Sequence, residues 1–246
     1  MNRPLAVIPF ISANTFAAYV AVRPPRPPPT VDEQAKYKAR KEISDLLSLI
    51  TWLTVPISLN FIVLFGVSEL YMVLSATYPS FRTPTLDTIL LPTPTEIPTA
   101  SDYYLSPIFI IASLALYAGA FLRQLCFHTL GRHFTYQLSL QQDHQLVTHG
   151  PYSFVRHPSY LGAILAFPGM LVVQMYSPGK WWVESGMWGT SKGQVVGGAW
   201  TVLVGYVCLA VLMRVAKEDL MLKMHFGEQW VSWAKKTRYA VIPFVW

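Results

Sequence analysis

Residues 46–68 read LLSLITWLTVPISLNFIVLFGVS, with no charged side chain between Asp45 and Glu69. These 23 residues are mostly apolar, and a helix of about 20 such residues crosses the hydrocarbon core of a bilayer. Transmembrane β-strands would instead alternate apolar and polar residues. The stretch therefore predicts a transmembrane helix that continues past Glu69 to Ser75, either as one long tilted helix or as two helices broken at Pro56.

Four further uncharged runs, each of 19 to 22 residues, are also long enough to cross a bilayer. They are Pro4–Val22, Tyr103–Leu122, Pro158–Gly179 and Gly193–Met213. The first also fits a cleaved signal peptide, but its apolar part is long for one, so we expect a retained span. The sequence therefore predicts an all-α, polytopic integral membrane protein with about five transmembrane helices.

The composition supports lipid as the solvent of the chain. Of the 246 residues, 52% are hydrophobic and 13% are charged, whereas an ordinary soluble domain carries about 25% charged residues. This composition excludes a disordered chain, a coiled coil and a nucleic-acid-binding arm. Cys126 and Cys208 lie far apart in apolar surroundings, which disfavours a disulfide framework and a thiolate metal site.

Basic residues alternate between rich and poor segments outside the spans, which hold six, one, three, two and six of them in chain order. Because cytosolic connections carry the excess of Lys and Arg, we expect the rich segments and the C-terminus to face the cytosol and the N-terminus to face the lumen. The first expected region is 1–124, with spans at 4–22, 46–75 and 103–122, a cytosolic Pro-rich, basic connection at 23–45 and a lumenal Pro- and Thr-rich connection at 76–102. The second is 125–246, with a polar loop at 125–160, spans at 158–177 and 193–213, and a cytosolic helix at 214–236.

The polar segment Gly131–Tyr160 contains four of the six histidines. Pro158 disfavours helical geometry at His157, so we expect a helix to begin here and to present Arg156 and His157 at its mouth. The free N–H groups of a helix start can bind an anionic or polar group. The alternative is a solvated loop whose aromatic residues contact lipid head groups. Zinc is disfavoured, because no two of these histidines have the i,i+4 spacing of a helical ligand pair and no acidic residue completes a set.

Arg214 and Glu218 follow the last apolar run, and their spacing places them on one face of a helix where membrane meets cytosol. Gly227 is expected to cap or bend this helix. The alternative is an interfacial helix whose charged side chains extend to the head groups. Ionisable groups at the end of a membrane helix nevertheless favour a functional site.

Three segments occur in order near the C-terminus: LVTHGPYSFVRHPSYLG at Leu146–Gly162, RVAKEDLMLKMHFGEQW at Arg214–Trp230 and IPF at Ile242–Phe244. With one helical hairpin between the first two, this half of the chain, about Leu125–Phe244, resembles the isoprenylcysteine carboxyl methyltransferase family. The N-terminal half is similar only in being hydrophobic. The resemblance implies that 125–246 is a catalytic region that binds S-adenosyl-L-methionine between the polar loop and the C-terminal helix, and that it methylates the C-terminal carboxylate of a prenylated cysteine.

The resemblance also implies which residues form the site. Arg214 would bind the substrate carboxylate, Glu218 would contact the amino group or the cationic side of the cofactor, and both would be catalytic. Asp219 stands where the family usually has a second Glu, and we assign it no role. The residues that the resemblance implies for the cofactor are Gln137, His144, Gln145, Leu146, Val147, Tyr152, His157, Pro158, Ser159, Tyr160 and Glu218.

The chemistry of methyl transfer suits these residue types. An ionised carboxylate has no proton to lose, so catalysis requires mainly that the carboxylate oxygen, the methyl carbon and the sulfur be aligned. Arg binds a carboxylate through two parallel hydrogen bonds and stays charged. The implied partners are proteins with farnesyl- or geranylgeranyl-cysteine C-termini and the lipid bilayer, with no metal and no nucleic acid. The implied location is the endoplasmic reticulum, with the active site in the cytosol.

Three other functions stay open from the residues alone. A phospholipid N-methyltransferase would use the same cofactor but needs no Arg for a carboxylate. A membrane sterol reductase would bind NADPH, whose 2′-phosphate requires clustered basic residues, whereas Arg214–Asp219 mixes both charges. A small transporter or scaffold fits the five spans, but transporters place polar groups at the midplane, and the apolar runs contain no charged residue.

Overall fold

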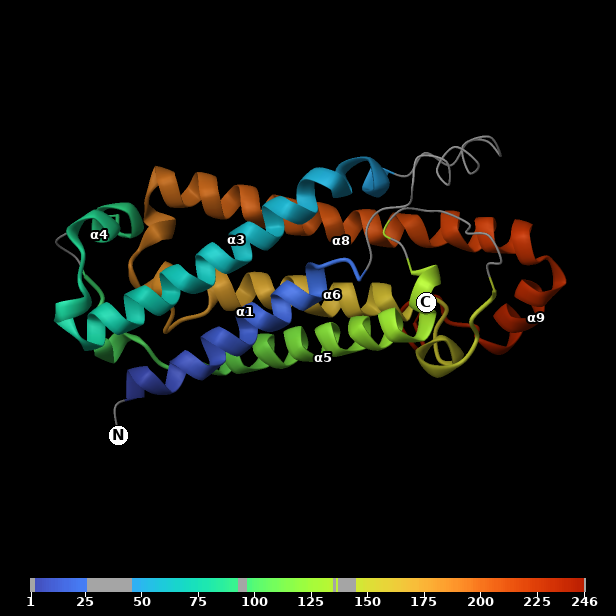
Figure 1. Ribbon diagram of the computed structural model, residues 1–246, viewed down its shortest axis with the longest axis horizontal. Helices are drawn as coiled ribbons and strands as arrows, with labels where there is room; N and C mark the ends of the chain where they lie inside the picture. The colour runs from blue at the N-terminus through green and yellow to red at the C-terminus, as the bar shows by residue number, and fades with distance from the viewer. Residues whose placement is uncertain (1–2, 26–45, 93–96, 135, 137–144, 246) are drawn as a thin grey trace. The chain divides into compact units, whose positions relative to one another are not determined.

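The computed structural model describes residues 3–25, 46–92, 97–134, 136 and 145–245, and every regular element in these ranges is a helix (Figure 1). The prediction of an all-α fold with five long apolar helices is confirmed, because five helical segments of 19 to 36 residues are long and apolar enough to cross a membrane. The long helices are α1 (Ile8–Val22), which follows the 3₁₀ turn η1 (Arg3–Val7), α3 (Leu46–Thr77), α5 (Pro107–Leu130), α6 (Pro158–Leu171) and α8 (Ser191–Phe226).

Shorter helical elements connect the long ones. α6 continues into the π-helical turn η6 (Val172–Tyr176), a geometry that occurs often at functional sites. The others are η2 (Pro79–Phe81), α4 (Pro84–Leu90), η3 (Ala100–Asp102), η4 (Gly131–His133), η5 (Gly150–Ser153), α7 (Trp181–Glu184), η7 (Met187–Gly189) and α9 (Glu228–Lys236).

Three helix boundaries differ from those predicted. α3 runs unbroken through Pro56, so the alternative of a broken pair is wrong. α5 begins at Pro107, four residues later than the predicted span, because Pro suits the first helical position and the Ser106 hydroxyl accepts the N–H of Phe109 at 3.3 Å. α8 continues past residue 213, and the helix ends only near Gly227, whose φ of +52° favours glycine. The predicted bend at Gly227 is therefore confirmed.

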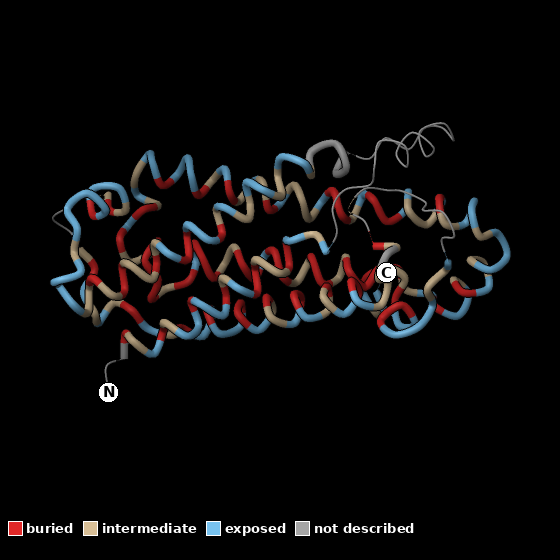
Figure 2. Tube along the Cα trace, in the orientation of Figure 1, coloured by how far each residue is buried: buried red, intermediate tan, exposed pale blue. Residues whose placement is uncertain are grey.

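Exposed positions recur along the long helices (Figure 2), and many of them are apolar residues. On α3, Trp52 and Leu64 are 73% and 66% exposed, and on α8, Val195 and Val202 are 70% and 71% exposed. Soluble proteins rarely expose apolar patches of this extent. Exposed apolar faces and helix length together indicate an integral membrane protein, as predicted.

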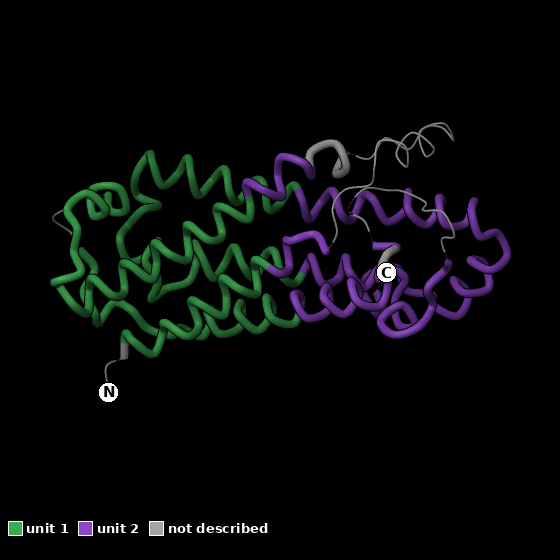
Figure 3. Tube along the Cα trace, viewed as in Figure 1, with its two compact units in different colours: residues 1–19, 58–118, 165–206 green, residues 20–57, 119–164, 207–246 purple. Residues whose placement is uncertain are grey.

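The chain divides into two compact units, each made of discontinuous segments (Figure 3). Unit 1 comprises Met1–Tyr19, Ser58–Ala118 and Leu165–Tyr206, and unit 2 comprises Val20–Ile57, Gly119–Ile164 and Val207–Trp246. The predicted division at residue 124 was made on function and stays a prediction. Each unit has its own buried apolar cluster: Phe109, Ala112 and Val173 in unit 1, and Cys126, Tyr152 and Trp233 in unit 2.

Candidate functional site

The segment just before α6 is hydrogen-bonded to C-terminal residues of unit 2. The backbone N–H of Arg156 donates to the carbonyl of Tyr239 at 2.9 Å, and that of His157 donates to the carbonyl of Ala240 at 2.7 Å. The Arg156 guanidinium also donates to the carbonyl of Arg238 at 2.7 Å. α6 begins at Pro158, as predicted. The two residues before it are therefore held in place by hydrogen bonds to the C-terminal segment.

Asp219 of α8 lies between the side chains of Arg156 and His157 in this turn. Its Oδ2 accepts from Nε and Nη2 of Arg156 at 3.2 and 3.1 Å, and its Oδ1 lies 3.0 Å from Nε2 of His157. The side chains are largely buried, with 15%, 3% and 16% exposure for Arg156, His157 and Asp219. Charge-assisted contacts of this kind are among the stronger ones in proteins. Asp219, for which the sequence predicted no role, therefore lies at the centre of the contacts that hold this turn.

Glu218, the neighbour of Asp219, faces three residues of the predicted site. Its Oε2 accepts a short hydrogen bond from the hydroxyl of Tyr160 and lies 3.8 Å from Nε of Arg214. His157 is 4.0 Å away through Nδ1, and its ring stacks on Tyr160 with centroids 5.3 Å apart. The structure therefore brings Arg214, Glu218, His157 and Tyr160 into one cluster, which we call the α6–α8 cluster.

Arg214 is held by a residue for which the sequence predicted no role. Its Nη1 donates to the backbone carbonyl of Tyr136, and the residue is only 4% exposed. The Tyr136 hydroxyl accepts from Nη2 of Arg123 at 2.7 Å and donates to the carbonyl of Val22 at 2.8 Å. Burial raises the pKa of Tyr136, so the phenol keeps the proton that it donates.

Arg123 connects this chain of contacts to the start of α6. The residue is 4% exposed, and its Nε donates to the carbonyl of Ala21 at 2.7 Å. Its Nη1 donates to both the backbone carbonyl and the hydroxyl of Ser159, at 3.2 and 3.3 Å. From the sequence, Arg123 was expected only to contribute to membrane orientation as one of the positive charges. The N–H groups of this buried arginine donate to three separate segments. These hydrogen bonds hold the segments together next to the site.

The remaining predicted cofactor residues lie at different depths. Leu146 and Val147 are partly buried and pack against the cluster of Cys126, Tyr152 and Trp233, whereas Gln145 is exposed. Burial, and to a smaller extent the charge of nearby groups that include Glu218, raises the pKa of Tyr152 well above its ordinary value. Tyr152 is therefore a neutral phenol near the α6–α8 cluster. Gln137 and His144 lie outside the described residues.

Tyr136→Phe should lower the stability of unit 2. The substitution removes a hydroxyl that links Arg123 to Val22, and it leaves a buried donor and a buried acceptor without this partner, which costs about 1–3 kcal/mol. We expect a lower midpoint of thermal unfolding in detergent, measured against Tyr78→Phe, which removes a hydroxyl from a residue that is 42% exposed in unit 1. Equal midpoints for the two variants would contradict the assigned linkage.

Fold and site together define a class of protein: an integral membrane protein with a buried cluster of mixed charge on two of its long helices. Comparison with known proteins then shows which family part of the chain resembles. Residues 110–182 match the family model described as the isoprenylcysteine carboxyl methyltransferase (ICMT) family. The match covers less than a third of the chain, and over this region the chain is similar to that family.

Two curated proteins of Arabidopsis thaliana are similar to the chain. Protein-S-isoprenylcysteine O-methyltransferase B is 30% identical over 135 residues, which cover 52% of this chain and 55% of the relative. Protein-S-isoprenylcysteine O-methyltransferase A is 27% identical over 140 residues, which cover 54% of this chain and 57% of the relative. The chain thus spans about half the length of the curated relatives that it matches. No solved structure matches it.

The family match covers one side of the site. Residues 110–182 include Arg123, Tyr136 and the predicted cofactor residues from Gln137 to Tyr160, but they end before Arg214 and Glu218. The roles of the α8 residues depend instead on their contacts with the matched part of the chain. Those roles, like the roles of the individual cofactor residues, stay predictions.

Proposed function

We propose that the chain is an S-adenosyl-L-methionine-dependent O-methyltransferase that methylates the C-terminal carboxylate of an S-prenylated cysteine. One observation carries the proposal: Glu218 of α8 contacts the predicted cofactor residues Tyr160 and His157 and lies 3.8 Å from Arg214, in a chain whose residues 110–182 match the methyltransferase family. We further propose that the site faces the cytosol, as the basic segments indicate, and that the membrane is that of the endoplasmic reticulum, as the family resemblance implies.

The α6–α8 cluster fits the charge of the cofactor. The side chain of Glu218 is 26% exposed, compared with 5% for Arg214 and 3% for His157, so Glu218 is the member most open to a ligand. A carboxylate beside aromatic rings suits a cationic sulfonium or ammonium group. When bound, S-adenosyl-L-methionine supplies a methyl group on a positively charged sulfur. Glu218 and Tyr160 would bind its cationic part, while His157 supports the ring of Tyr160.

Arg214 suits the other reactant, the substrate carboxylate. Its guanidinium can bind both oxygens of a carboxylate in parallel, and the Tyr136 carbonyl holds the group in place through Nη1. Because Arg214 is 4% exposed, a carboxylate that reaches it loses most of its water, and the attraction between the two charges is stronger there than in water. Arg214 would therefore bind and orient the nucleophile in the same step.

The proposed reaction needs no general base. A carboxylate oxygen forms a bond to the methyl carbon while the carbon–sulfur bond breaks, and the sulfur keeps the electron pair. No proton is transferred, so the contribution of the protein is to align the two reactants and to exclude water. The α6–α8 cluster meets this need for alignment, because its charged side chains hold one another in position. The prenyl chain of the substrate would stay in the bilayer, which explains why a reaction with a water-soluble cofactor takes place on membrane helices.

The purified chain should transfer the labelled methyl group of S-adenosyl-L-methionine to N-acetyl-S-farnesylcysteine. We expect the product to be base-labile, as a methyl ester is, and we expect no transfer to the amide of the same compound, because the amide lacks the carboxylate. Transfer to phosphatidylethanolamine instead would assign the chain to phospholipid N-methylation. Sterol reduction that depends on NADPH, without methyl transfer, would overturn the proposal.

A further inference from the structure

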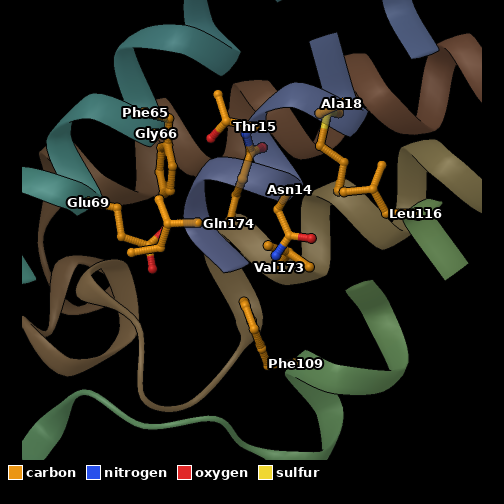
Figure 4. Close-up of a pocket in the computed structure, with 12 residues that line it drawn as sticks. Asn14, Thr15, Ala18, Phe65, Gly66, Glu69, Phe109, Leu116, Val173 and Gln174 are labelled. Carbon is orange, nitrogen blue, oxygen red and sulfur yellow. The ribbon is translucent and has the colours of Figure 1, made fainter. Parts of the chain in front are cut away.

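Unit 1 contains a pocket that has polar side chains among apolar helices (Figure 4). Asn14 of α1, Glu69 of α3 and Gln174 of η6 line it together with apolar residues such as Phe109 and Met170. All three polar residues belong to segments that are long and apolar enough to cross a membrane. Polar groups in such segments are costly and mark functional sites. Nothing in the proposed methyl transfer uses this pocket.

Two oxygen atoms at the pocket lack a hydrogen-bond partner among the described residues: Oδ1 of Asn14 and Oε1 of Glu69. Both residues are deeply buried, with 4% and 3% exposure. Nδ2 of Asn14 donates to the hydroxyl of Ser113 at 3.0 Å, which holds the amide in place and leaves its oxygen to accept. A buried acceptor without a partner costs about 1–3 kcal/mol. The pocket therefore requires a ligand that donates hydrogen bonds.

A buried lysine indicates the charge of that ligand. Lys180 is fully buried, and its ammonium group interacts electrostatically with Glu69. Its Nζ also lies 3.8 Å from the ring centroid of Phe109 and 3.4 Å from the carbonyl oxygen of Tyr104. Since Lys180 offsets the single negative charge at the pocket, a further cation would be a buried charge without a counter-ion, which is costly. The ligand is therefore neutral.

The presence of these two charges corrects one expectation. The helical span Thr51–Thr77 includes Glu69, as predicted, but the uncharged run Pro158–Gly179 was expected to end before Lys180, whereas the helical span Pro158–Glu184 includes that residue. These two helical spans are longer than the uncharged runs within them. A charged residue can lie inside a span when another residue of the folded chain is its partner.

The cavity volume, about 10 Å³, is enough for about one water molecule. We infer that the pocket is a binding site for a single water molecule that donates a hydrogen bond to Oδ1 of Asn14. This water gives the buried amide oxygen the partner that it lacks among the described residues. It lies among the helices of unit 1, so it belongs to the packing of that unit.

Hydroxyl-radical labelling with a pulsed X-ray beam tests the site directly, on the full chain in phosphatidylcholine nanodiscs. Radiolysis of a bound water forms radicals in place, and these oxidise adjacent side chains. Met170 lines the pocket and is 3% exposed, so its oxidation should be severalfold faster than that of Met72, which is 1% exposed in the same unit but does not line the pocket. Equal rates for the two methionines would overturn the inference.

Asn14→Leu provides the matched variant, because leucine fills the space and removes one acceptor. Its Met170 oxidation should fall to the Met72 level, whereas Ser185→Ala, at a buried serine of unit 1 that does not line the pocket, should keep the fast rate. A variant that unfolds would be recognised because its Met72 would also be oxidised faster. The comparison of Met170 with Met72 in the wild-type chain does not depend on any variant. A higher unfolding midpoint when sodium replaces N-methylglucamine would instead indicate a cation site and would also overturn the inference. None of these measurements depends on methyl transfer.

Discussion

Replacing Arg214 with alanine should lower kcat/KM for N-acetyl-S-farnesylcysteine by about 100-fold or more. Hydrogen bonds that involve a charged group contribute about 1.5–3 kcal/mol each, and Arg214 can offer two of them to a carboxylate. The effect should be at the large end because Arg214 is 4% exposed and water cannot replace the lost contacts. Single-turnover rates and substrate titrations separate loss of binding from loss of the chemical step.

Two further variants make the Arg214 result specific. Arg214→Lys keeps the charge but loses the planar fork, so we expect an intermediate rate. Lys217→Ala removes a positive charge from an exposed position on the same helix, and its kcat/KM should be close to that of the wild type. The affinity for S-adenosyl-L-methionine should change little in Arg214→Ala. A variant with normal turnover would remove Arg214 from the proposed mechanism, even if methyl transfer itself were established.

The five long helices could be predicted because the length of an apolar run depends on the thickness of the bilayer and requires no knowledge of tertiary contacts. Their ends were less predictable. α3 extends past Glu69 to Thr77, close to the predicted end at Ser75, but the fourth span extends past Lys180, where a search for uncharged runs stops, and Lys180 interacts there with Glu69. The extension of α8 through Arg214 follows from the same principle, since Glu218 contacts Tyr160 on α6 and Asp219 contacts His157 just before it.

Part of the candidate site could also be predicted. Pro158 and the spacing of Arg214 and Glu218 indicated which helix start and which helix face matter, and the structure brings these two features into contact. Tyr136 and Arg123 were missed because their partners lie far along the chain: Arg123 reaches Ala21 and Tyr136 reaches Val22. A signal did exist for Arg123, because a charged residue at the end of an apolar run needs a partner as well as a topological role.

Asp219→Asn should raise the dissociation constant for S-adenosyl-L-methionine by about tenfold or more, since it weakens two charge-assisted contacts worth about 1.5–3 kcal/mol each. Asn keeps the shape of the side chain but lacks the negative charge that attracts Arg156 and, when protonated, His157. The turn before α6 would loosen, and His157 would no longer support Tyr160 against the bound cofactor. Binding can be measured by calorimetry in detergent, without turnover.

Asp87→Asn supplies the control that separates positioning from general destabilisation. Asp87 is a buried acid in unit 1, 9% exposed, and it accepts a hydrogen bond from the hydroxyl of Tyr71 at 2.8 Å. Both variants should unfold at lower temperature, but only Asp219→Asn should weaken cofactor binding. Asp219→Glu should restore part of the affinity, because a carboxylate one methylene longer can still accept from Arg156. If the two Asn variants bound the cofactor equally well, Asp219 would stabilise unit 2 without positioning the site.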